Sequence, residues 1–207
     1  MTLQWYGQGQ KKFWLLGDSN VEGSGVAEPW MVNLAARVDD RVRPSGSHRT
    51  AVTYLGHRGS FRYKHSGTSG ITAQTIAGAV AGYSIGSEVP TDAFILAGIN
   101  DLAAARTPAQ IKADVEAIRN GILARYPSCR VWICALFPNG SYDVTATNAA
   151  FAAITGLNGG GFINGHIASW VIATHMQSGT NVHPNQVGHD KFAFDGVAAA
   201  MIAAGVI

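Results

Sequence analysis

The sequence contains little charge, only two cysteines and no long apolar run. Of its 207 residues 14% are charged and 47% are hydrophobic, a balance that excludes an intrinsically disordered chain. Fifteen Lys and Arg residues against thirteen Asp and Glu give a formal net charge of +2, and the basic residues form no dense run. The composition therefore does not indicate a nucleic-acid-binding protein.

Membrane spans and an ordinary secretion signal are also missing from the pattern. No segment approaches the roughly 20 apolar residues that a membrane-spanning helix needs. The apolar run at 13–16 is too short for a signal peptide, and residues 1–10, a polar segment with Trp5 and Tyr6, contain no uninterrupted apolar stretch of the required length. We expect a soluble protein with no membrane partner, located in the cytoplasm by default.

The two cysteines flank one expected strand, Cys129 at its start and Cys134 near its end. An extended chain rises roughly 3.3 Å per residue, which keeps the two thiols beyond disulfide reach of each other. We expect free, largely buried thiols, as in proteins of reducing compartments. Neither cysteine lies at a turn beside a histidine, so neither is a candidate nucleophile.

Short apolar runs alternate along the chain with segments of helical periodicity. The clearest helix begins at a capping box over 107–110 and ends before Pro127. Strands that alternate with helices predict a parallel sheet covered on both faces, within a single domain over 1–207. The expected strands are 12–16, 52–55, 61–63, 93–97, 131–136 and 162–167; the expected helices are 29–38, 72–83, 107–126, 146–157 and 186–204, with a basic loop at 41–49.

Ser19 directly follows the first expected strand, in the segment Gly-Asp-Ser-Asn. A strand that ends in a tight turn presents a side chain at the carboxyl edge of the sheet, where open α/β sheets have their sites. A serine becomes a nucleophile only with a base in hydrogen-bond reach. Of the seven histidines His183 suits this role best, because Pro184 restricts its backbone to extended conformations and a helix is expected to follow.

Two further segments complete a pattern of four. Gly70 lies in Ser-Gly-Ile-Thr, and Asn100 lies in Gly-Ile-Asn-Asp. In chain order these and the segments of Ser19 and His183 resemble the four blocks of the SGNH (GDSL-type) hydrolase family, over about 13–200. The resemblance implies a three-layer α/β/α sandwich with a central parallel sheet, the flavodoxin-like SGNH hydrolase fold.

The resemblance also implies roles for these residues. Ser19 would be the nucleophile and His183 the general base. The oxyanion hole would comprise the backbone N–H groups of Ser19 and Gly70 and the side-chain amide of Asn100. Gly70 fits better than Gly67, because its segment matches the family block. Taken alone, Gly70 is equally typical of a turn and Asn100 of a helix cap.

The chain departs from the family pattern before the histidine. The family usually has aspartate three residues earlier, to orient the imidazole, and here that position is Thr180. The Thr180 backbone carbonyl or its hydroxyl can accept the Nδ1 proton instead, and Asn181 is a third choice. A remote acid, Asp190 or Asp143, is a further alternative without a supporting motif. We favour the carbonyl, since it needs no particular side chain.

Other acids and histidines suggest no different chemistry. Asp18 and Asp101 each adjoin a site residue, so we expect their side chains to bind backbone donors of their own loops. His183 and His189 are six residues apart, which matches no common metal-binding spacing. We therefore expect neither metal nor cofactor.

These expectations lead to a serine esterase that hydrolyses short-chain carboxylic esters, for example acetyl esters, through an acyl-Ser19 intermediate. Little chain remains for a lid, which favours short acyl groups. The substrate would be a small-molecule or carbohydrate ester, with Trp30, Tyr142 and Trp170 as candidates to line the leaving-group side, although Trp30 also suits the core. Two alternatives stay open: an acyltransferase that uses the same serine, and a non-catalytic binding module on the same scaffold. The oligomeric state is not indicated.

Overall fold

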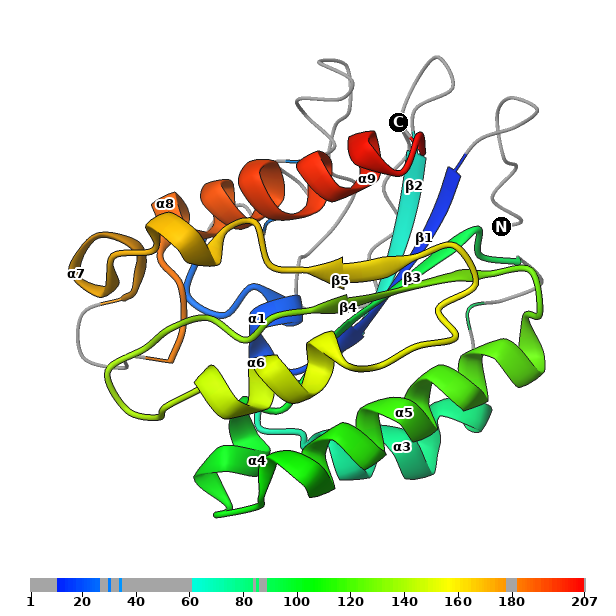
Figure 1. Ribbon diagram of the computed structural model, residues 1–207, viewed down its shortest axis with the longest axis horizontal. Helices are drawn as coiled ribbons and strands as arrows, with labels where there is room; N and C mark the ends of the chain where they lie inside the picture. Colours follow the sequence, from blue (N-terminus) through cyan, green and yellow to red (C-terminus); the bar gives the residue numbers. More distant parts are fainter. Residues whose placement is uncertain are drawn as a thin grey trace.

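A five-stranded parallel sheet forms the centre of the molecule (Figure 1). The computed structural model describes residues 11–26, 30, 34, 61–83, 85, 89–177 and 182–206. The strand order is β2-β1-β3-β4-β5, and each neighbouring pair is parallel. The strands are β1 (Lys11–Gly17), β2 (Phe61–Gly67), β3 (Asp92–Leu96), β4 (Arg130–Cys134) and β5 (Gly161–Ile163).

The order of the strands reverses beside β1, because β2 lies on one side of it and β3 on the other. Open α/β sheets of the flavodoxin-like order have their ligand sites at such a switch point, beyond the carboxyl ends of the strands. Ser19 follows β1 and Asn100 follows β3, so both start from this point of the sheet.

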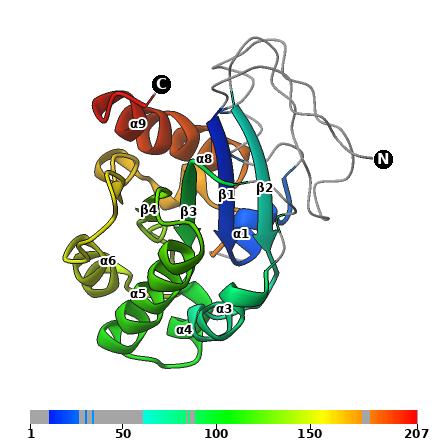
Figure 2. The same cartoon turned by 90° about the vertical axis from the view of Figure 1, so that its right-hand side faces the viewer.

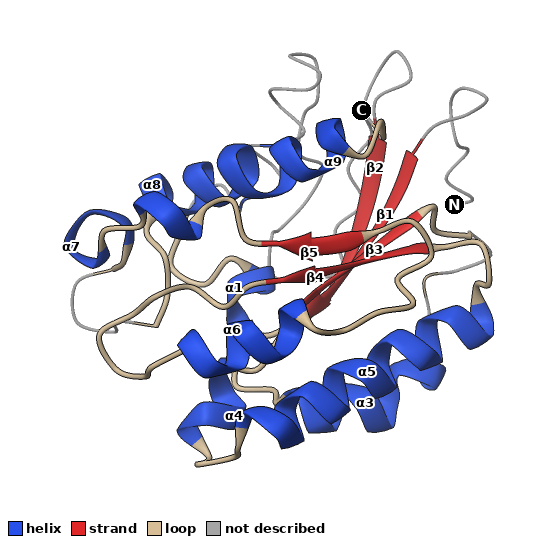
Figure 3. Ribbon diagram, viewed as in Figure 1, coloured by secondary structure: helices blue, strands red, loops and turns tan. Residues whose placement is uncertain are grey.

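Helices cover both faces of the sheet, as the views in Figures 1 and 2 show. One face carries α3 (Ala73–Ala79), the 3-10 turn η1 (Val80–Gly82), α5 (Pro108–Arg125) and α6 (Thr145–Ala152). The other carries a continuous C-terminal helix made of α8 (Gln186–Lys191), the π segment η3 (Phe192–Ala198) and α9 (Ala199–Ala203). Short helices lie beyond three strand ends: α1 (Ser19–Glu22) after β1, α4 (Ile99–Ala103) after β3, and η2 (Ile167–Ser169) followed by α7 (Ile172–His175) after β5 (Figure 3).

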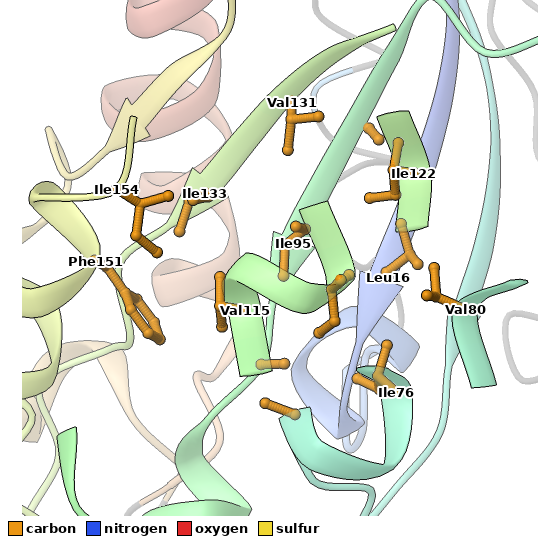
Figure 4. Close-up of a cluster of buried hydrophobic side chains, with 14 of the residues drawn as sticks. Leu16, Ile76, Val80, Ile95, Val115, Ile122, Val131, Ile133, Phe151 and Ile154 are labelled. Carbon is orange, nitrogen blue, oxygen red and sulfur yellow. The ribbon is translucent and has the colours of Figure 1, made fainter. Parts of the chain in front are cut away.

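The core is divided by the sheet, because successive strand residues point to opposite faces. Phe13 and Leu15 of β1 pack with the C-terminal helix, whereas Trp14 and Leu16 pack with α3 and α5. Figure 4 shows part of the second cluster, with the apolar side chains of three strands facing those of the helices. Burial on both faces explains why the strands are continuous apolar runs.

The predicted fold class is confirmed, and most predicted elements are present. The 107–126 prediction corresponds to α5, whose capping box forms between Thr107 and Gln110. Both cysteines are free and buried, and burial raises the pKa of Cys129 to about 12. No helix in the described part of the chain is long and apolar enough to cross a membrane.

Several boundaries differ from the prediction, for example those of β2, which extends to Gly67, and of β4, which ends at Cys134. The strand expected at 162–167 ends at Ile163, since the chain turns at Gly165, where a side chain would collide with the Asp195 carbonyl. The helix expected at 146–157 ends at Ala152, and Gly156 adopts φ +70°. The helix expected at 72–83 becomes a 3-10 turn after Ala79.

Some predictions concern residues outside the described ranges. These are the loop at 41–49, the strand at 52–55 and most of the helix at 29–38. Within that last segment Trp30 and Leu34 are described, and both are helical and fully buried.

Candidate active site

Ser19 is the first residue of α1, immediately beyond β1. The preceding Asp18 caps the helix, because its side chain accepts a hydrogen bond of 2.9 Å from the Asn20 backbone N–H. At Gly17 a side chain would collide with the carbonyl of Leu96 in β3, so glycine allows β1 to end this close to its neighbour. The sharp strand-to-helix turn thereby fixes Ser19, which is 3% exposed, at the carboxyl edge of the sheet.

His183 reaches Ser19 from the other end of the chain. Its Nε2 lies 2.7 Å from the Ser19 Oγ, a hydrogen-bond distance between residues 164 positions apart. The histidine is half-buried, and this burial lowers its pKa below the ordinary value. A lowered pKa keeps the imidazole neutral near pH 7, and a neutral Nε2 can accept the serine proton.

Gly70 and Asn100 lie in two connections that leave the same edge of the sheet. Gly70 adopts φ +77° in the turn between β2 and α3, and a Cβ there would meet open space. Asn100 lies in α4, and its Nδ2 donates a 2.9 Å bond to the carbonyl of Ile71. An amide nitrogen carries two hydrogens, so one remains available to a ligand.

The sheet order explains why these residues share one place. Ser19, Gly70 and Asn100 follow the carboxyl ends of β1, β2 and β3, which are neighbours in the sheet. The loop of His183 completes the group through its contact with Ser19. Sequence segments that are far apart therefore meet at the switch point.

The buried carboxylates of Asp18 and Asp101 accept hydrogen bonds from the backbone at this edge of the sheet. Asp18 is fully buried, one of its oxygens has no partner among the described residues, and burial raises its pKa to about 7. Asp101 accepts bonds from the Ala73 backbone N–H (2.7 Å) and from Arg106 (2.8 Å). The prediction of bonds to each residue's own loop is right for Asp18 and wrong for Asp101, which holds the first turn of α3.

The residue expected to orient His183 falls outside the described part of the chain, since Thr180 and Asn181 both do. Of the remote acids, exposed Asp143 accepts a 2.9 Å bond from the Thr145 backbone N–H at the start of α6. Asp190 accepts one of 3.2 Å from Gln186. These bonds give no reason to assign either carboxylate to the imidazole.

Two amide side chains that the sequence analysis does not single out support the His183 loop. Asn185 caps α8 by accepting a bond from Gly188, and it donates to the carbonyls of Thr174 and Met176. Gln177 bonds to the backbone on both sides of the site. The capping position of Asn185 is readable from the sequence, whereas the distant backbone partners of Gln177 are not.

The histidines and the large aromatic residues near the site have structural surroundings that limit their roles. Within the described ranges no three His, Cys, Asp or Glu side chains are grouped to hold a metal. The Nδ1 of His189 accepts a 3.2 Å bond from the backbone N–H of Trp30, and burial lowers the pKa of His189 to about 3. Trp30 packs in the core against Phe192, whereas Trp170 and Tyr142 are half-buried.

A family model decides the class of this chain. The model of the GDSL-like lipase/acylhydrolase family matches residues 15–191. The chain belongs to this family. It is thus a carboxylic ester hydrolase of the GDSL type, and the sequence-based recognition is confirmed.

Several solved structures share the fold of this chain. A mutant acetyl esterase, in which one serine is replaced by alanine and an acetate ion is present, matches with 22% identity, a TM-score of 0.66 and coverage of 94% of this chain and 97% of that one. A family 3 carbohydrate esterase of Clostridium thermocellum matches with 17% identity, a TM-score of 0.71 and coverage of 94% and 96%. A family 3 carbohydrate esterase of Talaromyces cellulolyticus matches with 21% identity, a TM-score of 0.64 and coverage of 96% of this chain and 100% of that one. The search of curated proteins finds no significant match.

Proposed function

We propose that this hydrolase cleaves short-chain carboxylic esters, for example acetyl esters, through an acyl-Ser19 intermediate. The observation that carries the proposal is the 2.7 Å contact between the Ser19 Oγ and the His183 Nε2. Nucleophile and base at this distance are the arrangement that serine acyl transfer requires.

The chemistry proceeds in two steps. In the first, His183 Nε2 takes the proton of Ser19 as Oγ bonds to the ester carbonyl carbon; the carbon–oxygen bond to the alcohol then breaks, and the alcohol leaves with that proton. In the second, His183 takes a proton from water, whose oxygen attacks the acyl carbon. The acid departs and Ser19 regains its proton.

The oxyanion formed in each step would be bound by three donors. These are the backbone N–H groups of Ser19 and Gly70 and the free N–H of the Asn100 amide. The bond from Asn100 to the Ile71 carbonyl supports this role, because it fixes the amide before substrate arrives. Removing one such donor typically costs about 10²–10³ in kcat.

His183 also needs an acceptor for its Nδ1 proton, and we assign this role to the Thr180 backbone carbonyl. A carbonyl fixes the imidazole tautomer without adding a charge, which makes the catalytic unit a dyad with a neutral orienting group. The proposal predicts that the side chain at this position contributes little.

Two observations support a small acyl group and a polar ester. A Cβ at Gly70 would meet no atom within 4 Å, its chain neighbours apart, so there is room for substrate beside this donor. Proteins of the same fold include an acetyl esterase and carbohydrate esterases. A small-molecule or carbohydrate ester is therefore the proposed substrate.

Replacing the nucleophile tests the proposal. Ser19→Ala should lower hydrolysis of p-nitrophenyl acetate by about 10⁴-fold or more, with an unchanged melting temperature. Acetate release should be compared with acetyl transfer to an added alcohol, which separates a hydrolase from a transferase. Turnover that persists in purified Ser19→Ala would refute the acyl-Ser19 intermediate.

A further inference from the structure

The side-chain amide of Gln177 joins the segment that carries Ser19 to the segment that carries His183. Its Nε2 donates a 2.7 Å bond to the carbonyl of Ser24 and a 3.0 Å bond to the carbonyl of Pro184. An amide nitrogen has two hydrogens, so each carbonyl receives one of them. Ser24 and Gln177 are 153 residues apart, which makes this a long-range tie.

Each of the two carbonyls is closely coupled to a reacting side chain. The backbone N–H groups of Gly23 and Ser24 both donate to the carbonyl of Ser19, at 2.9 and 3.0 Å. Ser24 therefore moves with the nucleophile. Pro184 is the residue after His183, so its carbonyl moves with the base.

The backbone of residue 177 adds a third bond to the same loop. Its N–H donates a 2.8 Å bond to the carbonyl of His183, next to an antiparallel bridge between Met176 and Pro184. The main chain thus holds Gln177 beside the histidine, and its side chain is left to reach across to α1.

The side-chain amide of Gln177 lies close against the backbone of Gly25. Gly25 adopts φ +79°, and a Cβ at this position would lie 2.6 Å from both the Nε2 and the Oε1 of Gln177. Gln177 itself is half-buried. The turn after α1 therefore passes directly over the amide, with glycine at the point of contact.

From this geometry we infer that Gln177 is a positioning residue, which sets the distance between Ser19 Oγ and His183 Nε2 through the two carbonyls. The inference rests on the proposed function, because it concerns the reactivity of that pair. A misplacement of about 1 Å in an active site can cost about 10²-fold in rate. The tie acts on the relative position of two loops, so its loss should affect the chemical step more than substrate binding.

The chain offers a matched control in Asn158. Its Nδ2 also donates to two backbone carbonyls, those of Pro127 and Cys129, each at 3.0 Å. Both carbonyls precede β4, at the end of the sheet opposite to the site. Gln177→Glu and Asn158→Asp therefore make the same chemical change, at a half-buried and an exposed position, since each replaces a doubly donating amide by a carboxylate that can donate neither bond.

The experiment compares these variants with p-nitrophenyl acetate as substrate. Gln177→Glu should lower kcat roughly 10- to 100-fold with KM changed less than about threefold, whereas Asn158→Asp should leave both within about twofold. Gln177→Met, which removes the donors without adding charge, should also lower kcat and serves if the charged variant does not fold. Unchanged kcat in a folded Gln177→Met overturns the inference, as does an equal loss in Asn158→Asp.

A second comparison separates positioning from a general structural role. In a His183→Ala background, Gln177→Met should cause no further loss in the rate at which a fluorophosphonate labels Ser19, because there is no imidazole left to position. A further loss of the same size as in the wild type would overturn the inference. If Ser19→Ala retains turnover, the proposed function fails instead; if only the Gln177 variants are silent, the proposed function stands without this residue.

Discussion

Each end of the sheet has a buried aspartate, but the two differ in how fully their carboxylate oxygens are hydrogen-bonded. At the amino end, Asp92 opens β3 and its two oxygens accept four bonds, two from Arg130 at 2.7 and 2.8 Å, one from Trp132 at 2.9 Å and one from Thr91 at 2.7 Å. At the carboxyl end, Asp18 follows β1, and one of its oxygens has no partner among the described residues. Both side chains are fully buried.

The difference between Asp92 and Asp18 indicates that the amino end of the sheet contributes mainly to stability and the carboxyl end mainly to function. A satisfied buried carboxylate tied to an arginine supports the fold, whereas an unsatisfied one lowers stability and is commonly found near functional sites. The pKa values follow the same division. Burial raises the pKa of Asp18 to about 7, while the bond to Asp92 raises the pKa of Arg130 and keeps it charged.

Asp18→Asn should remove the free-energy cost of burying a charged carboxylate at the carboxyl end of the sheet. Because the folded pKa of about 7 exceeds the ordinary unfolded value of about 3.9, the folded state binds the proton more tightly. Asp18 therefore lowers stability progressively as pH rises from about 4 to 7. The variant should be more stable than the wild type above pH 7, by up to about 4 kcal/mol, with the gain vanishing near pH 4.

Urea unfolding of both proteins from pH 4 to pH 8 measures this difference. A gain that is constant over the whole range would show that Asp18 is not protonated preferentially in the folded state.

Asp92→Asn should have the opposite effect at the amino end. It leaves Arg130 without its charged partner, and because each Asp92 oxygen accepts two bonds, the amide nitrogen would face two donors that lose their acceptor. We expect a loss of about 3 kcal/mol in unfolding free energy, toward the lower end for buried pairs because Arg130 is 26% exposed. The kcat of the folded enzyme should not change. A clear fall in kcat would contradict the claim that the amino end of the sheet contributes to stability and not to catalysis.

Asn100→Ala probes function at the carboxyl end without a large effect on stability. Because the amide would act mainly on the developing oxyanion, kcat should fall about 10²–10³-fold with little change in KM. Steady-state kinetics with p-nitrophenyl acetate measures both parameters. A change confined to KM would assign Asn100 to substrate binding instead.

Gly70→Ala should have a smaller effect. No atom lies within 4 Å of the added Cβ, so the cost comes from φ +77°, on the order of 1 kcal/mol. Gly205→Ala is the matched control, with φ +65° and equally open space. Both variants should lose similar stability in thermal unfolding, but only Gly70→Ala should lower kcat, because relaxation of that φ would turn the Gly70 N–H away from the oxyanion; an unchanged kcat would show that catalysis does not depend on the position of this N–H.

Thr180→Ala should have the smallest effect, because the proposed acceptor for His183 is a backbone carbonyl that the change preserves. Thr180→Asp should then give no large gain. An increase in kcat approaching the roughly 10⁴-fold that an orienting carboxylate can contribute would mean that His183 is poorly held in this chain.

The sequence predicts the elements whose signals are local. The capping box at Thr107 and the apolar runs of β1 and β3 carry their own pattern, and the four segments around the site predict the class of hydrolase. Helices α4 and α7 have five and four residues, too few for a periodic pattern. The bonds of Gln177 and of Asp101 depend on tertiary structure, because their partners lie in other elements.

The most direct test of the central claim is covalent labelling of Ser19. An intact-mass measurement after treatment with a fluorophosphonate should show one adduct on the wild type, none on Ser19→Ala and slow formation on His183→Ala. The labelling rate should rise with pH through a midpoint below about 6.5, since burial lowers the pKa of His183 and only the neutral imidazole accepts the proton. An adduct on Ser19→Ala, or equal labelling rates for the wild type and His183→Ala, would contradict the account.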